Sequence, residues 1–273
     1  MFESRRSHST FSLAMAMLEN SFHAGARKVR QTHRYAIMAI VMSLIQSLLF
    51  LAAFYVMLTF LGQRGASVRG DFMLYLLTGI FAYLTHIKSV QAITGAENST
   101  SALMQHAPMN TLVAILSSAL SVLYTQTVSL LMILLLLHTV LQPITIHYWP
   151  GALLMFILSW ASGCVIGLLF MALKPWVPDL AGILQQVCVR ANMIASGKMF
   201  VANMMPTAVI GLFDWNPLFH IIDQARGFTF VNYFPHHSNW QYPVYATLVL
   251  LVIGMMGEAY TRRYASDSWN AGR

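Results

Sequence analysis

The sequence predicts an all-α integral membrane protein with six transmembrane helices, and two observations carry this prediction. Of the 273 residues, 57% are hydrophobic and only 9% are charged, whereas an ordinary soluble domain is about 25% charged. The chain also contains apolar runs longer than the roughly 18 residues that a membrane helix requires. No Asp, Glu, Lys or Arg occurs between Tyr35 and Gln63, or between Asn98 and Leu173. The second of these runs is long enough for two crossings.

The boundaries of the six spans follow from the polar residues between the apolar runs. The segment "TVLQPITIHYWPG" separates the third span from the fourth. Its Tyr148 and Trp149 are placed as aromatic residues at a membrane interface are. The six spans are expected at residues 35–61, 72–94, 112–140, 151–173, 180–205 and 242–260, within a membrane domain covering residues 35–263.

The basic residues predict the orientation of the chain. An even number of spans places both termini on one side. That side would carry eleven lysines and arginines, against three, Arg64, Arg69 and Arg226, on the other. Because basic residues are enriched on the cytoplasmic side, both termini are expected in the cytoplasm. The net charge of +7 is then a consequence of topology, and nucleic acid is not an expected partner.

The segment 1–34 is expected to form a cytoplasmic amphipathic helix at the membrane interface, and residues 264–273 a cytoplasmic tail. Phe11, Met15, Leu18 and Phe22 recur at helical spacing. An increasingly basic flank that ends in Arg27 and Lys28 suits an inner-leaflet surface. The alternative interpretation is a plain basic tail.

Neither catalytic nor metal-binding residues are expected. The two cysteines, Cys164 and Cys188, lie within predicted spans without CxxC spacing, and no HExxH sequence occurs. His220 and Asp223 are one helical turn apart and are expected to form a local hydrogen bond rather than an acid–base pair.

A nucleotide site is not expected either, because Gly197 and Lys198 lack the upstream glycine of a phosphate-binding loop. The chain should therefore bind no cofactor and should not hydrolyse ATP by itself.

Two basic residues fall within the fifth expected span, Arg190 and Lys198. A basic side chain at the centre of a membrane helix costs about 2.5 to 3.5 kcal/mol, so such residues face protein or an aqueous cavity. Eight residues apart on one helix, the two side chains would lie about 12 Å apart along the axis and roughly 80° apart around it. Both are therefore candidates for a substrate pathway. In the alternative interpretation they reach a headgroup layer or pair with a carboxylate such as Glu258.

Three sequence segments resemble a known family. They are "GCVIGLLFMALKPWVPDL", "ASGKMF" followed by Pro206, and "WNPLFHIIDQARGF", all between Gly163 and Phe230. Together with the order of the spans, they resemble the type-2 ATP-binding-cassette export permeases, most closely those that export capsular polysaccharide and O-antigen. The resemblance in these motifs covers about a quarter of the chain.

The resemblance implies that the segment before the last span returns into the membrane as short re-entrant helices. Asn216 and Pro217 suit the start of such a helix, since asparagine caps helices and proline fits the first turn. The expected exit gate consists of Phe213, Trp215, Asn216, Pro217, Phe219 and Arg226, with Phe228 and Phe230 also at interface depth. The alternative is an external loop with a surface helix.

The resemblance also implies the partners. The polar segment after the second span would be a coupling helix for a separate ATPase subunit, which would use ATP and Mg²⁺, and its candidate residues are Glu97, Asn98, His106 and Pro108. A plain connecting turn is the alternative. The permease would act as a homodimer in the bacterial inner membrane, and its substrate would be a lipid-linked polysaccharide.

Other functions stay open at this point. A type-2 exporter of another substrate, such as a lipid, a drug or another glycoconjugate, has the same layout. A gradient-driven transporter is disfavoured because no acidic relay residues within spans and no two similar halves are visible. An intramembrane enzyme would need a convergent set of acid, base or metal-binding residues.

Overall fold

The computed structural model describes Met15 and residues 19–25, 36–60, 72–96, 111–140 and 143–264. These residues form helices and loops, and none of them is in a strand. The helices, in chain order, are α2 Ala36–Phe60, α3 Phe72–Thr94, α5 Thr111–Val140, α6 Trp149–Leu173, α7 Pro178–Ala195, the 3-10 helix η1 Ala202–Met204, α8 Thr207–Ile210, α9 Pro217–Thr229 and α10 Gln241–Tyr264.

Five of these helices are long and apolar enough to cross a membrane: α2, α3, α5, α6 and α10. The prediction of an all-α integral membrane protein is therefore confirmed. The five helices lie close to the first, second, third, fourth and sixth expected ranges, and α10 continues four residues beyond the expected end, from 260 to Tyr264.

The fifth expected span, 180–205, is wrong in its C-terminal part. The helix there, α7, has 18 residues and ends at Ala195. Its Asp179, Gln185 and Arg190 make it less apolar than the five candidate spans. The chain turns at Gly197, whose φ of 72° lies in the left-handed region that favours glycine.

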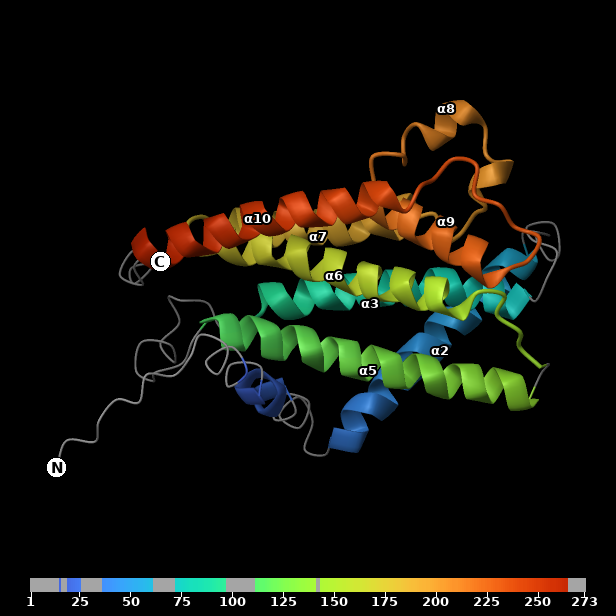
Figure 1. Ribbon diagram of the computed structural model, residues 1–273, viewed down its shortest axis with the longest axis horizontal. Coiled ribbons are helices and arrows are strands. Elements are labelled where there is room, and N and C mark those ends of the chain that lie inside the picture. Colours follow the sequence, from blue (N-terminus) through green and yellow to red (C-terminus); the bar gives the residue numbers. More distant parts are fainter. Residues whose placement is uncertain are drawn as a thin grey trace.

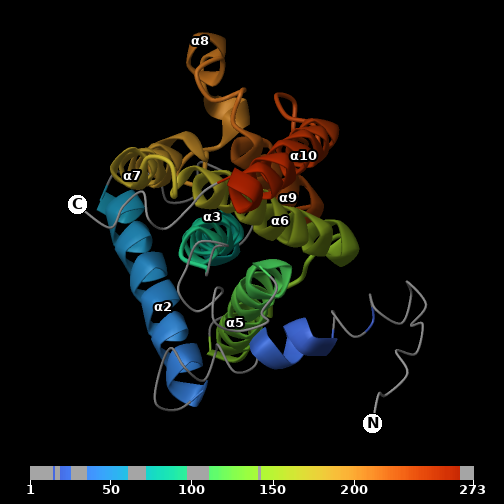
Figure 2. The same cartoon turned by 90° about the vertical axis from the view of Figure 1, so that its left-hand side faces the viewer.

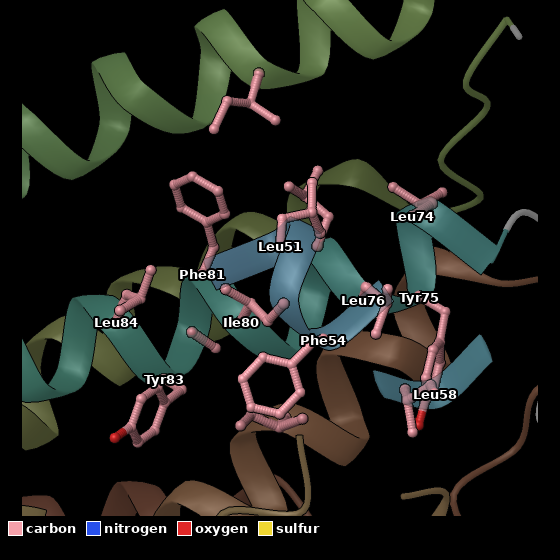
Figure 3. Close-up of a cluster of buried hydrophobic side chains, with 14 of the residues drawn as sticks. Leu51, Phe54, Leu58, Leu74, Tyr75, Leu76, Ile80, Phe81, Tyr83 and Leu84 are labelled. Carbon is pink, nitrogen blue, oxygen red and sulfur yellow. The ribbon is translucent and has the colours of Figure 1, made fainter. Parts of the chain in front are cut away.

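The helix α3 lies at the centre of the bundle. In its most apolar window, 83% of the residues are buried, against 22% for α2, α5 and α10. Figure 3 shows Phe54 of α2 beside Ile80 of α3, with Phe81 of α3 directed toward α5. The central position explains why α3 is buried on all sides although its sequence is the least apolar of the first four spans.

Close packing of α3 against α6 depends on two glycines of the "GCVIG" sequence. A Cβ atom added to Gly167 would lie 2.7 Å from the carbonyl oxygen of Val90, and one added to Gly163 would overlap the carbonyl oxygen of His86. Two glycines four residues apart let membrane helices approach closely. Side-chain hydrogen bonds then join the helices, including one of 2.9 Å between Nδ1 of His86 and Oγ of Ser162.

The helices α3, α5, α6, α7 and α10 run along the long axis of the molecule, whereas α2 crosses obliquely (Figures 1 and 2). Figure 1 shows α8 and α9 at the end of the bundle opposite to the end where α10 finishes. The segment between α7 and α10 is thus gathered at one end of the bundle.

Of the predicted N-terminal helix, the structure describes Met15 and residues 19–25, all helical. A Cβ atom on Gly25 would lie 3.2 Å from the carbonyl oxygen of Ser117, so this piece contacts α5. Phe22 is exposed and Ser21 is buried. The rest of the expected segment 1–34, and the tail from residue 265, lie outside the described residues.

Candidate functional site

The candidate site is the segment from Ser196 to Trp240, which joins α7 to α10 at one end of the bundle (Figure 1). It contains the short helices η1 and α8 and the longer helix α9. α9 packs against α6, α3 and α10. The segment is therefore built partly into the bundle and partly outside it.

Arg226 lies near the end of α9 and is 1% exposed. Its Nη1 donates to the carbonyl oxygens of Gly197 and Phe200 at 3.0 and 2.7 Å. Its Nη2 donates to the carbonyl oxygen of Lys198 at 2.8 Å. The planar guanidinium thus binds three backbone carbonyls of the turn that follows α7, a geometry that lysine does not offer.

Two residues of α3 complete the surroundings of Arg226. The guanidinium carbon lies 4.2 Å from the ring centroid of Tyr75, within cation–π distance. A Cβ atom on Gly79 would lie 2.9 Å from Nη2 of Arg226, so only glycine leaves room there. Arg226 is therefore not a solvent-exposed loop charge, because it is buried and binds the backbone between α7 and η1.

Lys198 is also buried, at 1% exposed. Its Nζ donates to the carbonyl oxygen of Met193 at 2.6 Å and lies 3.4 Å from the ring centroid of Tyr83. The lysine follows the end of α7 and does not share that helix with Arg190, which is exposed. The expected arrangement, with both charges along one helix, is therefore wrong, since the helix stops at Ala195.

Asn216 begins α9 and joins it to the end of α7. Its Oδ1 accepts the backbone N–H of Leu218 at 3.0 Å, and Pro217 occupies the first helical turn, which confirms the predicted cap. Its Nδ2 donates to Oδ1 of Asn192 at 2.9 Å and to the carbonyl oxygen of Ala195 at 3.0 Å. A single buried amide thus satisfies groups on both helices.

The expected aromatic group divides into exposed and buried members. Trp215 is 65% exposed, and Phe213 is half-buried with its ring 5.3 Å from that of Phe200. Phe219 and Phe230 are buried inside the protein, so their rings pack against other side chains and do not lie on the surface. The ring of Phe219 lies under Gly197, where a Cβ atom would approach it to 2.8 Å.

His220 does not bond Asp223, contrary to the expectation. Its Nε2 lies 2.7 Å from the carbonyl oxygen of Asp214, and its Nδ1 accepts the N–H of Asn239 at 3.2 Å. Because Nδ1 accepts a hydrogen bond, Nε2 must be the protonated ring nitrogen, and it donates a hydrogen bond to the carbonyl oxygen of Asp214. His220 thus ties the α8–α9 connection to the loop before α10.

The carboxylate of Asp223 accepts hydrogen bonds from the hydroxyls of Tyr233 and Ser238, the second at 2.7 Å. Burial and the neighbouring carboxylate raise the pKa of Tyr233. The hydroxyl therefore stays protonated and acts as a donor. Asp223 and His220 together fix the loop 230–240 against α9.

The structure adds residues that the sequence did not single out, above all Tyr75, Gly79, Tyr83 and Asn192. Tyr75, Gly79 and Tyr83 recur every four residues on α3. This spacing places them on one face, which was a usable signal, although nothing in it identified Arg226 and Lys198 as their partners. The expected coupling residues Glu97, Asn98, His106 and Pro108 lie outside the described residues.

These features define a multi-pass, all-α membrane protein with a partly buried segment of short helices before its last crossing. No protein-family model matches the chain. Two curated proteins of Escherichia coli are similar to it, both described as polysialic acid transport protein KpsM. Each is 24% identical over 191 residues, which cover 68% of this chain and 71% of the relative. The resemblance to polysaccharide-export permeases is thereby confirmed, at a distant level.

Proposed function

We propose that this chain is the membrane-spanning permease subunit of an ATP-binding-cassette exporter that moves a lipid-linked polysaccharide across the bacterial inner membrane. The observation that carries the proposal is the similarity to the two KpsM transport proteins over two thirds of the chain. The five apolar helices and the segment 196–240 at one end of the bundle agree with such a role.

The proposed complex contains two copies of the chain and two copies of a separate ATPase subunit, which binds ATP and Mg²⁺. Both termini and the segment with Glu97, Asn98, His106 and Pro108 lie on the cytoplasmic side in this proposal. Closure of the ATPases would push on that segment and shift the helices. The helices would then have two arrangements, and ATP binding by the partner would favour one of them.

In the proposed pathway Arg190 faces the substrate, since it is a charged and exposed side chain on α7. Lys198 does not face the substrate in this proposal. Its ammonium donates to the carbonyl oxygen of Met193 and lies over the ring of Tyr83, so its role is structural. Trp215 and Phe213, the less buried aromatic residues of the expected exit gate, would border the exit. Arg226 and Asn216 would keep the exit segment in place.

The proposal is tested by deleting the gene from its host and measuring surface and intracellular polysaccharide. Loss of surface polysaccharide with accumulation inside the cell is expected, and the intact gene should restore export. In parallel, the tagged chain should co-purify with an ATP-binding-cassette ATPase. ATP hydrolysis by the purified chain alone, or unchanged surface polysaccharide after deletion, would contradict the proposal.

A further inference from the structure

A second candidate site lies away from the segment 196–240, in a cavity between α2, α3 and α5. The cavity has a volume of about 730 Å³. Its lining includes Lys88, the polar residues Ser43, Gln91 and Gln126, and apolar side chains of α2. Lys88 is the only charged residue that lines it among those the structure describes.

The polar groups of the cavity are incompletely paired. Nζ of Lys88 and Nε2 of Gln126 both donate to Oγ of Ser43, each at 3.0 Å. An ammonium has three donors, and this bond uses one of them. Oε1 of Gln126, whose side chain is 1% exposed, has no hydrogen-bond partner in the described part of the chain. A cation with spare donors thus lies near a buried acceptor that lacks a donor.

The lining of the cavity continues into an apolar surface. Met42, Ile45 and Leu49 of α2 line it and are exposed in the isolated chain. A lysine within a membrane-spanning helix is costly unless it is paired or hydrated. An occupant with a negative headgroup and an apolar chain would match both parts of this surface.

We propose that the cavity binds the phosphate headgroup of an anionic amphiphile, whose headgroup carries no compensating cation. The phosphate accepts from Nζ of Lys88, a headgroup hydroxyl donates to Oε1 of Gln126, and the acyl chain lies along the exposed face of α2. Membrane phospholipids and lipid-linked glycans share this chemistry. The site does not depend on the export function proposed above, because lipid binding is measured without transport.

The experiment titrates the purified, detergent-solubilised chain with phosphatidylglycerol, phosphatidic acid and phosphatidylcholine, and follows binding by native mass spectrometry. Phosphatidylglycerol should bind about tenfold more tightly than phosphatidylcholine, because phosphatidylcholine carries the same phosphate but adds a choline cation beside Lys88 and lacks a hydroxyl for Gln126. Lys88→Gln should reduce this preference to the part that comes from the hydroxyl contact with Gln126, whereas Lys88→Arg should retain it in full. Arg263→Gln, which removes an equal charge from the exposed end of α10, is the matched control and should also retain it.

The hydroxyl contact has its own test. Gln126→Leu should weaken phosphatidylglycerol but leave phosphatidic acid unchanged, because phosphatidic acid has no glycerol headgroup hydroxyl. This comparison remains informative if Lys88→Gln does not fold. Equal affinities for phosphatidylglycerol and phosphatidylcholine, or an unchanged preference in Lys88→Gln, would overturn the proposal.

The source of the natural occupant is distinguished by the lipids that remain bound after purification from cells with and without glycan synthesis. A phospholipid in both preparations assigns the cavity to a membrane lipid. A glycan-bearing lipid found only in the first assigns it to the exported molecule. Retention of zwitterionic lipids alone in both would overturn the proposal.

Discussion

The guanidinium of Arg226 on α9 lies 4.2 Å from the ring centroid of Tyr75 on α3. Its Nη groups bind the carbonyl oxygens of Gly197, Lys198 and Phe200. One buried cation therefore joins the central helix, the turn after α7 and the helix before α10. The energetic consequences of this arrangement are measurable in single variants.

Arg226→Lys should destabilise the protein, because lysine cannot reach three carbonyls with one planar group. Each lost bond to a charged donor is expected to cost about 1.5 to 3 kcal/mol, partly offset by the remaining ammonium. Thermal unfolding in detergent measures the change. Arg263→Gln, at an exposed position, should leave the unfolding temperature unaltered. An equal unfolding temperature for Arg226→Lys would show that these bonds contribute little.

Gly79→Ala should also lower the unfolding temperature. Its Cβ atom would lie 2.9 Å from Nη2 of Arg226 and 3.2 Å from Cα of Lys198, and overpacking typically costs about 1 to 3 kcal/mol. The matched control is Gly182→Ala on α7, where no atom lies within 4 Å. That control should be neutral or stabilise by roughly 0.5 to 1 kcal/mol, since alanine favours helix. Equal effects at both positions would refute the packing argument.

Asn216 provides a test of the connection between α7 and α9. Asn216→Ser keeps an acceptor for the N–H of Leu218 but loses the two donations to Asn192 and Ala195. Asn216→Ala loses all three, and the cap alone is expected to contribute about 1 kcal/mol. The order of unfolding temperatures should be wild type, then Ser, then Ala. Equal values for Ser and Ala would mean that the cap does not stabilise α9.

Arg190 and Lys198 should respond differently to substitution. Arg190→Gln is expected to reduce polysaccharide export with unchanged folded yield, because the side chain is exposed on α7. Lys198→Gln should reduce the folded yield, because the bond to Met193 and the contact with Tyr83 are lost. Export and yield are measured in the same membranes. Full export by Arg190→Gln would remove that residue from the proposed pathway.

Exposed and buried aromatic residues of the segment 196–240 should also differ in how their substitution affects export and stability. Trp215→Ala is expected to impair export without lowering stability, since the ring is 65% exposed. Phe219→Ala should destabilise by about 3 to 5 kcal/mol, as for other buried phenylalanines. Unfolding curves and export assays separate the two effects. Normal export by Trp215→Ala would contradict a role at the exit.

The sequence by itself determined the class of protein and the position of most helices. Long uncharged runs leave few alternatives to membrane helices, and Asn216 followed by Pro217 is a local signal for a helix start that the structure bears out. Hydropathy and capping depend on neighbouring residues, so they are readable without the fold. The family resemblance rested on equally local motifs and agreed with the two similar transport proteins.

Tertiary structure alone decided where the charges of the last third lie. The sequence showed Lys198 and Arg226 as polar residues in an apolar setting, which favoured a pathway or a gate. The fold places both beneath aromatic rings of α3 and against backbone carbonyls. Tyr75 and Tyr83 come more than a hundred residues earlier in the chain than these partners. Hydropathy patterns report only each segment's own preference for lipid or water, whereas cation–π and carbonyl contacts arise only after the segments have packed.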